Sequence, residues 1–162
     1  MLIRNQSELE SFMRGILNKV VADVTKKLLD NLLQAIQDTI YDADVDRKIY
    51  AYGDSEPTGE FKRSWESIVS NTSRAVTGFI FQDYNVMTYD PEDAIHGDIY
   101  TGDQRENIAR ALNEGYTSIF GAGWWEKPRG YWDIAFKVVQ DGTLDRWIVE
   151  SFRHNGINII KK

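Results

Sequence analysis

The segment Pro57-Thr58-Gly59-Glu60-Phe61-Lys62-Arg63-Ser64-Trp65 decides how this chain is organised. Proline fixes φ and glycine permits a sharp reversal, so Pro57, Thr58 and Gly59 predict a corner at which the chain leaves one element and begins another. Phe61 and Trp65 are four residues apart, so they lie on one side of a short helical turn and can contact each other. We expect this structural corner to separate a long helix from short strands.

An amphipathic pattern precedes the corner. Apolar residues recur at steps of three and four from Leu9 to Ile40, which predicts one long helix over residues 7–41. Ser7 and Glu10 have the spacing of a capping box, in which each side chain satisfies an otherwise unpaired amide at the helix start. We therefore expect the helix to begin at this pair.

Three aspartates, Asp42, Asp44 and Asp46, follow the predicted helix. Negative charge is unfavourable at a helix C-terminus, so the helix should end there. Their alternating spacing resembles a calcium-binding loop, but the glycine and the distal glutamate of an EF-hand are absent at the right offsets. We interpret them as a solvated acidic helix end.

Residues 57–82 predict the corner followed by a β-hairpin. The runs 67–70 and 75–81 are β-prone and are separated by the polar residues 71–74. The next segment, 83–103, is rich in Asp, Tyr, Gly and Pro without a sustained period, which predicts a long loop.

Residues 104–160 predict helices and a closing strand. Apolar residues at helical spacing indicate a helix that stops near Gly115, a second that is broken or bent near Gly142, and a third that stops at Gly156. Residues 157–160 alternate enough to suggest a final strand.

Length and composition favour one α+β domain over residues 1–162, with the long N-terminal helix and the C-terminal helices packed on a small antiparallel sheet. The chain has 162 residues, 42% of them hydrophobic, which suffices for one core. It has no cysteine, so a disulfide or thiolate metal site is excluded. The formal net charge of −6 argues against general binding to nucleic-acid phosphates. We expect a soluble protein made in the cytoplasm, since we find neither a signal peptide nor a membrane-spanning run.

The sequence predicts no catalytic residue, cofactor or metal. His96 and His154 have no companion ligand at short spacing, and His154 is better explained by a favourable interaction with a helix C-terminus. One alternative stays open, a carbohydrate-binding or glycan-active module. It would use Trp124 and Trp125 for stacking on sugars, and carboxylates of an acidic loop. Those carboxylates are Asp90, Glu92, Asp93 and Asp98.

Adjacent tryptophans suggest a protein interface. Trp124 and Trp125 follow the glycine-rich residues 121–123 and cannot both be buried easily in one small domain, so at least one is an interface candidate, with core packing as the alternative. We add Tyr84 and Tyr89 as aromatic candidates. Arg129 is another, because guanidinium makes planar bidentate pairs with carboxylates; an ordinary surface charge is the alternative.

A long helix followed by Thr-Gly-x-(Leu/Phe)-x-x-Ser and short strands resembles the head–tail joining or tail-completion proteins of tailed-phage necks. Residues 111–117 resemble a Glu-Gly-Thr-type turn of that family. Residues 127–132 resemble a reordered form of the Arg-Pro-aromatic segment that begins its C-terminal helix. In order, these similarities extend over residues 7–154.

The resemblance implies a non-enzymatic virion protein that forms a ring, a hexamer or dodecamer, between the capsid portal and the tail. Its partners would be further copies of itself and the other neck, connector and tail proteins. Genomic double-stranded DNA would pass through the lumen without sequence-specific binding, and no membrane would be involved. The protein would be made in the host bacterial cytoplasm. A third hypothesis, a small acidic toxin-neutralising protein, rests on charge and size alone.

Overall fold

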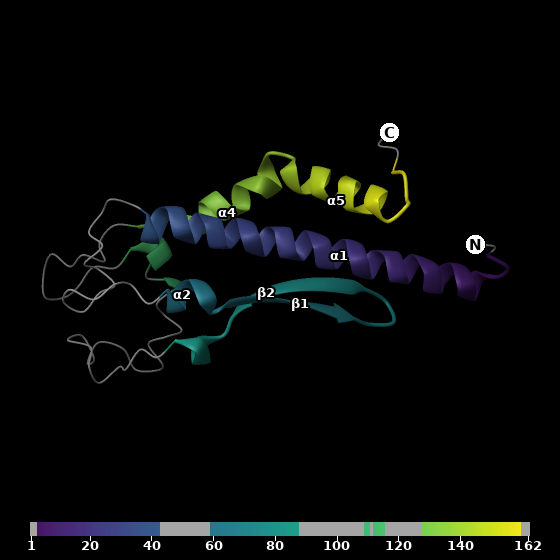
Figure 1. Ribbon diagram of the computed structural model, residues 1–162, viewed down its shortest axis with the longest axis horizontal. Coiled ribbons are helices and arrows are strands. Elements are labelled where there is room, and N and C mark those ends of the chain that lie inside the picture. The colour runs from purple at the N-terminus through teal and green to yellow at the C-terminus, as the bar shows by residue number, and fades with distance from the viewer. Residues whose placement is uncertain (1–2, 43–58, 88–108, 111, 116–127, 160–162) are drawn as a thin grey trace, which may run out of the picture. The chain divides into compact units, whose positions relative to one another are not determined.

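The computed structural model describes residues 3–42, 59–87, 109–110, 112–115 and 128–159 (Figure 1). The elements are α1 (Gln6–Ile36), a π-helical turn (Gln37–Tyr41), α2 (Glu60–Arg63), β1 (Trp65–Asn71), β2 (Val76–Gln82), a 3-10 turn (Tyr84–Val86), α4 (Tyr131–Gln140) and α5 (Thr143–His154). Residues 109–110 and 112–114 are also helical. The long N-terminal helix, the small antiparallel sheet and the C-terminal helices confirm the predicted α+β class.

The helix α1 begins with a capping box two residues earlier than predicted. The Asn5 Oδ1 atom accepts a hydrogen bond of 2.9 Å from the Glu8 amide, and Glu8 Oε2 accepts one of 2.8 Å from the Arg4 amide. The prediction that Ser7 and Glu10 form the cap is therefore wrong. Asparagine caps a helix as well as serine does. Asn5 and Glu8 have the same spacing as Ser7 and Glu10, and they form the cap instead.

The far end of the long helix lies where the sequence predicts it. After Ile36 the chain widens into a single π-helical turn that ends at Tyr41, and the amide of Asp42 donates to the carbonyl of Gln37 at 2.8 Å. Burial, the largest influence, raises the pKa of Tyr41 above its ordinary value. The other two aspartates of the acidic triplet, Asp44 and Asp46, lie outside the described residues.

Contacts between backbone positions divide the chain into two compact units. The first contains the described parts of Met1–Asp30, Ser67–Phe81 and Phe136–Lys162, and the second those of Asn31–Glu66 and Gln82–Ala135. This division does not decide whether residues 1–162 form a single domain, which stays a prediction.

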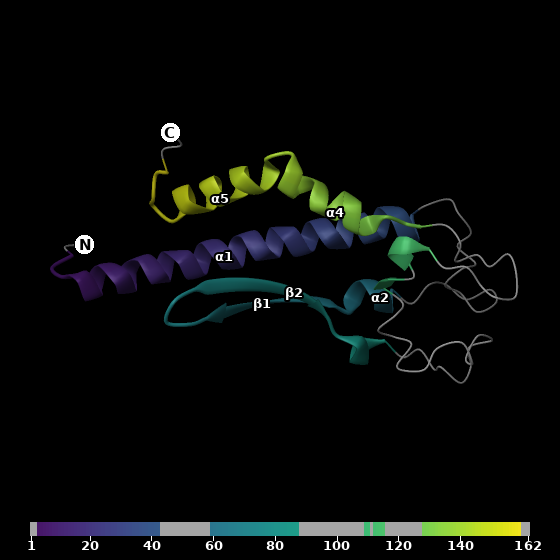
Figure 2. The same cartoon turned by 180° about the vertical axis from the view of Figure 1, so that it is seen from behind.

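The first unit has three layers. Figures 1 and 2 show the hairpin on one side of the N-terminal part of α1 and α5 on the other. Ile16, Val20 and Val24 of α1 are buried, and half-buried apolar residues pack against them, including Leu144 and Ile148 of α5. Burial of such a side chain contributes roughly 1.5–3 kcal/mol to folding. These contacts therefore contribute much of the stability of the first unit.

The second unit is built on the last turns of α1. Its buried apolar residues come from α1, the π-helical turn, α2, the first residue of β1, the end of the 3-10 turn, residue 112 and α4; they are Leu32, Ala35, Ile36, Ile40, Phe61, Trp65, Met87, Leu112, Tyr131 and Ala135. Polar bonds tie these segments together. Asn31 Nδ2 donates to the Ala135 carbonyl at 2.8 Å, and Lys62 Nζ donates to Gln37 Oε1 at 2.9 Å.

The predicted helix stops are confirmed, whereas the closing strand is wrong for the described residues 157–159. Gly115, Gly142 and Gly156 all have a positive φ: the first follows the helical residues 112–114, the second lies between α4 and α5, and the third follows α5. Residues 157–159 are not a strand. The Ile157 amide instead donates to the Phe152 carbonyl at 2.9 Å, and the Ile157 side chain packs on the core of the first unit.

Candidate functional site

The corner begins with a left-handed glycine. Gly59 has φ of 73°, a conformation that residues with a side chain rarely adopt, and it directly precedes α2. The predicted contact between Phe61 and Trp65 is confirmed: both residues are buried, and their rings meet edge to face with centroids 6.2 Å apart. Pro57 and Thr58 lie outside the described residues. In its described part the corner is a packed structural joint.

Two aromatic residues at the start of α4 extend this pair into a cluster. Tyr131 is completely buried and meets Phe61 edge to face at 5.9 Å, while Trp132 meets Trp65 in the same way at 5.3 Å. The Tyr131 hydroxyl donates to the carbonyl of Ala109 at 2.8 Å. Edge-to-face pairs each add roughly 0.5–1.5 kcal/mol beyond burial, so the cluster anchors the corner to the start of α4.

The two C-terminal segments that carry the family resemblance lie against each other. The Arg129 amide donates to the Leu112 carbonyl at 3.0 Å, and the Gly130 amide to the Asn113 carbonyl at 3.1 Å. The Asn113 Oδ1 atom also accepts a 3.0 Å bond from the Trp132 amide in the first turn of α4. A residue 19 positions upstream therefore caps α4, which sequence spacing alone does not reveal.

The predicted interface residues divide into described and undescribed ones. Tyr84 is half-buried in the 3-10 turn, which Asp83 caps by accepting from the Asn85 amide at 3.0 Å. Arg129 is half-buried beside α4. The other predicted residues lie outside the described part of the chain; they are Tyr89, Asp90, Glu92, Asp93, His96, Asp98, Trp124 and Trp125.

An exposed apolar surface on the hairpin was not predicted. Ile68, Phe79 and Phe81 expose 56%, 50% and 42% of their surface. We call these three residues the hairpin outer face. Along β2, Phe79 and Phe81 alternate with Gly78 and Ile80, which are half-buried. The signal was present in the sequence, because an isolated glycine within a strand often marks a close backbone approach and thereby identifies the inner face.

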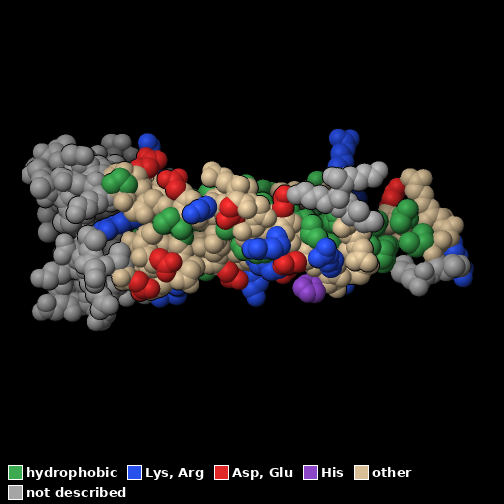
Figure 3. Space-filling view, turned by 90° about the horizontal axis from the view of Figure 1, so that it is seen from above, with side chains coloured by type: hydrophobic (Ala, Val, Ile, Leu, Met, Phe, Trp, Pro, Cys, Tyr) green, Lys and Arg blue, Asp and Glu red, His purple; other side chains and the backbone are tan. Residues whose placement is uncertain are grey.

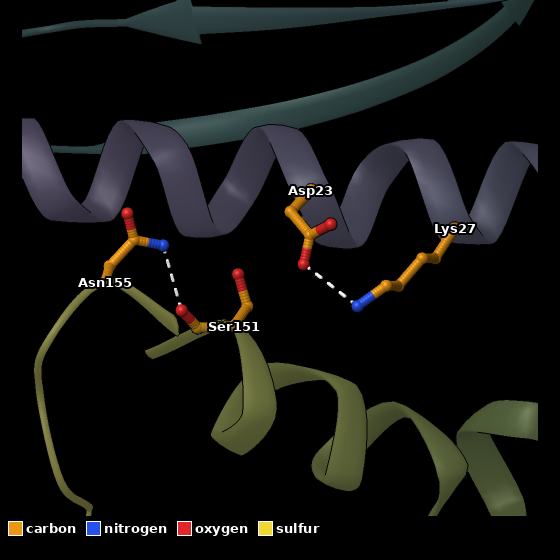
Figure 4. A network of polar contacts seen from close by, with 4 residues as sticks. All are labelled: Asp23, Lys27, Ser151 and Asn155. Carbon is orange, nitrogen blue, oxygen red and sulfur yellow. Dashed lines mark hydrogen bonds and ion pairs between the residues drawn. The ribbon is translucent and has the colours of Figure 1, made fainter. Parts of the chain in front are cut away.

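Polar side chains of α1 and α5 form a network on the other side of the first unit, with each hydrogen bond or ion pair lying within one of the two segments (Figure 4). Lys27 Nζ pairs with the Asp23 carboxylate at 3.0 Å, and Asn155 Nδ2 donates to the Ser151 carbonyl at 2.9 Å. Partial desolvation raises the pKa of Asp23, but this is outweighed by the Lys27 hydrogen bond, the Ser151 hydroxyl and the charges of Lys27 and His154. The pKa of Asp23 is lowered overall.

Ser151 has an unusual place in this network. It is only 1% exposed, and its hydroxyl has no hydrogen-bond partner within bonding distance in the structure. It nevertheless lies near enough to Asp23 to favour the ionised carboxylate. His154, the last residue of α5, is exposed. The position of His154 at the end of α5 fits the expectation that it lies at a helix C-terminus.

Three further observations apply to the described residues only. No group of three or more His, Cys, Asp or Glu side chains among them is placed to hold a metal ion. None of the helices they form combines the length and the apolar character that a bilayer crossing requires. Over α4 and α5, basic and acidic side chains are interspersed (Figure 3).

No family model, curated protein or solved structure matches this chain.

Proposed function

We propose that this protein is a structural subunit of a tailed-phage neck, where copies form a ring that joins the capsid portal or connector to the tail. The proposal rests on the resemblance in the sequence. The observation that carries it is the order of elements: a long helix, a left-handed glycine corner, a short helix with Phe61 and Trp65 in contact, a hairpin, and C-terminal helices. A contact between residues 112–113 and 129–130 adds support, because both segments belong to the resemblance.

The role proposed is binding and assembly rather than catalysis. Phe61, Trp65 and Tyr131 of the aromatic cluster are buried, so the cluster stabilises the joint. The exposed apolar residues lie elsewhere, on the hairpin outer face. Exposed apolar surface of this kind is typical of protein interaction sites.

Deletion and complementation of the gene in the encoding phage test this role. We expect the deletion to yield filled heads and separate tails, and the wild-type gene to restore joined particles that contain the protein. Trp124→Ala with Trp125→Ala should impair joining while leaving circular dichroism and Tm largely unchanged. Gly15→Ala is the matched control, because the added Cβ would meet no atom within 4 Å apart from its chain neighbours and the nearby backbone of its own helix. Normal infectious particles from the deletion would contradict the proposal, and glycan binding that depends on Trp125 would favour the carbohydrate alternative.

A further inference from the structure

The hairpin offers two open strand edges. Among the described residues the sheet consists of β1 and β2 alone, so the outer edge of each strand is unpaired. The Thr72 amide donates to the Ala75 carbonyl at 2.9 Å, and the Asp83 amide donates to the Ser64 carbonyl at 2.7 Å. Both bonds fit a single antiparallel register, so the pairing between the two strands is fixed over the length of the hairpin.

This register decides which backbone groups of β1 face outward. Hydrogen-bonded pairs alternate with non-hydrogen-bonded pairs along an antiparallel ladder, so the amides and carbonyls of residues 66, 68 and 70 point toward β2. Those of Ser67, Val69 and Asn71 point to the open edge. Unpaired edge groups of this kind are a template for another strand. The partner that satisfies them has to supply a backbone in the extended conformation.

The helix α1 covers β2 more closely than β1 (Figures 1 and 2). A Cβ at Gly78 of β2 would lie 1.9 Å from Thr25 Oγ1, so the strand approaches the helix closely there. On the same face of β1, Ser67 and Asn71 are exposed, whereas that face of β2 is half-buried along its whole length. The open edge of β1 therefore lies farther from α1 than the open edge of β2 does.

Two copies can pair through β1 without a collision of their α1 helices. A twofold axis perpendicular to the sheet makes the paired strands antiparallel and keeps both helices on one face. Adjacent strands are about 4.8 Å apart, so pairing through β1 separates the two β2 strands by three spacings, about 14 Å. Packed helices need about 8–10 Å between their axes, so both helices fit. Pairing through β2 would leave only about 4.8 Å, which excludes two helices.

The sequence of β1 is complementary to itself in this arrangement. When Ile68 lies opposite Ile68 of the second copy, Ser67 of each copy forms a hydrogen-bonded pair with Val69 of the other. The single charged residue of β1, Glu66, then lies opposite Ser70 of the other copy, so no like charges meet across the new edge. A second copy of β1 is thus a partner that the open edge accepts without repulsion.

We propose that two copies of this protein associate through the open edges of β1 and form one antiparallel sheet of four strands about a twofold axis. Ile68 and its neighbour on β2, Phe79, expose 56% and 50% of their surface. Pairing brings both residues and their counterparts into one row across the sheet, where cross-strand apolar contacts add stability. The contact follows from the strand edge and its register, and it does not depend on a role in a phage neck.

Opposite charges at Ile68 test the pairing by analytical ultracentrifugation of the full chain. The wild type should dimerise at about 100 µM, where micromolar contacts are populated. Ile68→Lys and Ile68→Glu each place like charges opposite each other at the twofold axis, so each variant should dimerise about tenfold more weakly. Their equimolar mixture should form dimers again. Thr77→Lys is the matched control, because Thr77 is exposed on the same face but belongs to β2.

A backbone change tests the strand edge independently of the Ile68 side chain. Ser67→Pro removes an amide that points to the open edge, and proline is tolerated where an edge strand directs its amide to solvent. It should weaken dimerisation about tenfold, because the twofold axis doubles the lost hydrogen bond. Ser67→Ala keeps the amide and is the matched control. Circular dichroism and Tm establish that each variant folds, and the Ser67 pair decides the question if the charged variants do not.

Three results would overturn the proposal. The first is a wild type that stays monomeric at about 100 µM, which would leave the open edge of β1 to a strand of another protein. The second is a mixture of folded Ile68→Lys and Ile68→Glu variants that associates no better than either alone. The third is a folded Ser67→Pro variant that dimerises as well as Ser67→Ala. All three are separate from the gene deletion that tests the neck role.

Discussion

Gly78→Ala tests the packing of the hairpin on α1. The new Cβ would lie 1.9 Å from Thr25 Oγ1, 3.0 Å from its Cβ and 3.1 Å from its Cγ2. Rotation of the Thr25 side chain cannot clear the new methyl, because Thr25 Cβ itself is too close. Overpacking of this kind costs about 1–3 kcal/mol, whereas Ala in place of Gly within a strand gains only about 0.5–1 kcal/mol. We therefore expect a net loss of stability.

Urea and thermal unfolding measure this loss. A change of 1 kcal/mol corresponds to about 2–4 °C in Tm for a chain of this size. Thr25→Ala removes the two outer atoms of the obstacle, so Gly78→Ala should cost less in that background than alone. Gly15→Ala is the control: the site is open and helical, and alanine should stabilise it by about 0.5–1 kcal/mol. If Gly78→Ala is as stable as the wild type, the described contact between β2 and α1 is wrong.

Three further predictions concern single interactions. Tyr131→Phe should destabilise by about 0.5–1.5 kcal/mol through loss of the bond to Ala109, while Tyr131→Ala should cost about 3–5 kcal/mol in urea unfolding; equal losses would contradict its place in the core. Asn113→Ala should cost about 1 kcal/mol, and an unchanged unfolding midpoint would show that it does not cap α4. The pKa of Asp141 is lowered below the ordinary 3.8, and the largest cause is the hydrogen bond that its carboxylate accepts from the Thr143 amide. The stability that this bond contributes is present above pH 3.8 and is lost as the pH falls through the lower pKa of the folded state. The loss of stability caused by Asp141→Ala should therefore become smaller in acid. A deficit that stays constant with pH would refute this.

The sequence predicted those elements whose signals are local. Apolar periodicity identified the long helix, and the hairpin followed from two β-prone runs around a polar turn. Glycines at 115, 142 and 156 ended helices because a positive φ is readily available only to glycine. The contact between Phe61 and Trp65 needed only their spacing of four.

Features that depend on remote partners were missed. Ile157 fits a strand by pattern, but the apolar side of α5 and α1 gives it a burial site that a third strand does not. Asn113 caps α4 only because the chain returns to it. The helix cap was predicted at Ser7 instead of Asn5 for another reason. Two equivalent capping patterns lie two residues apart, and the capping preferences of asparagine and serine do not distinguish them.

The candidate surface was the least predictable part. The aromatic residues Phe79 and Phe81 fit a buried strand equally well by composition, and the isolated Gly78 is the one local signal for the inner face. The contact of Gly78 with Thr25 and the exposure of both rings show that they face outward. The tryptophans favoured by sequence, Trp124 and Trp125, lie outside the described residues and stay predictions.

The mass of the native assembly is the most direct test of whether this protein works by fitting copies of itself together. Native mass spectrometry of gently purified protein, over a range of concentrations, measures it. We predict a single closed stoichiometry of more than one copy. A mass of one chain at every concentration would contradict the central claim.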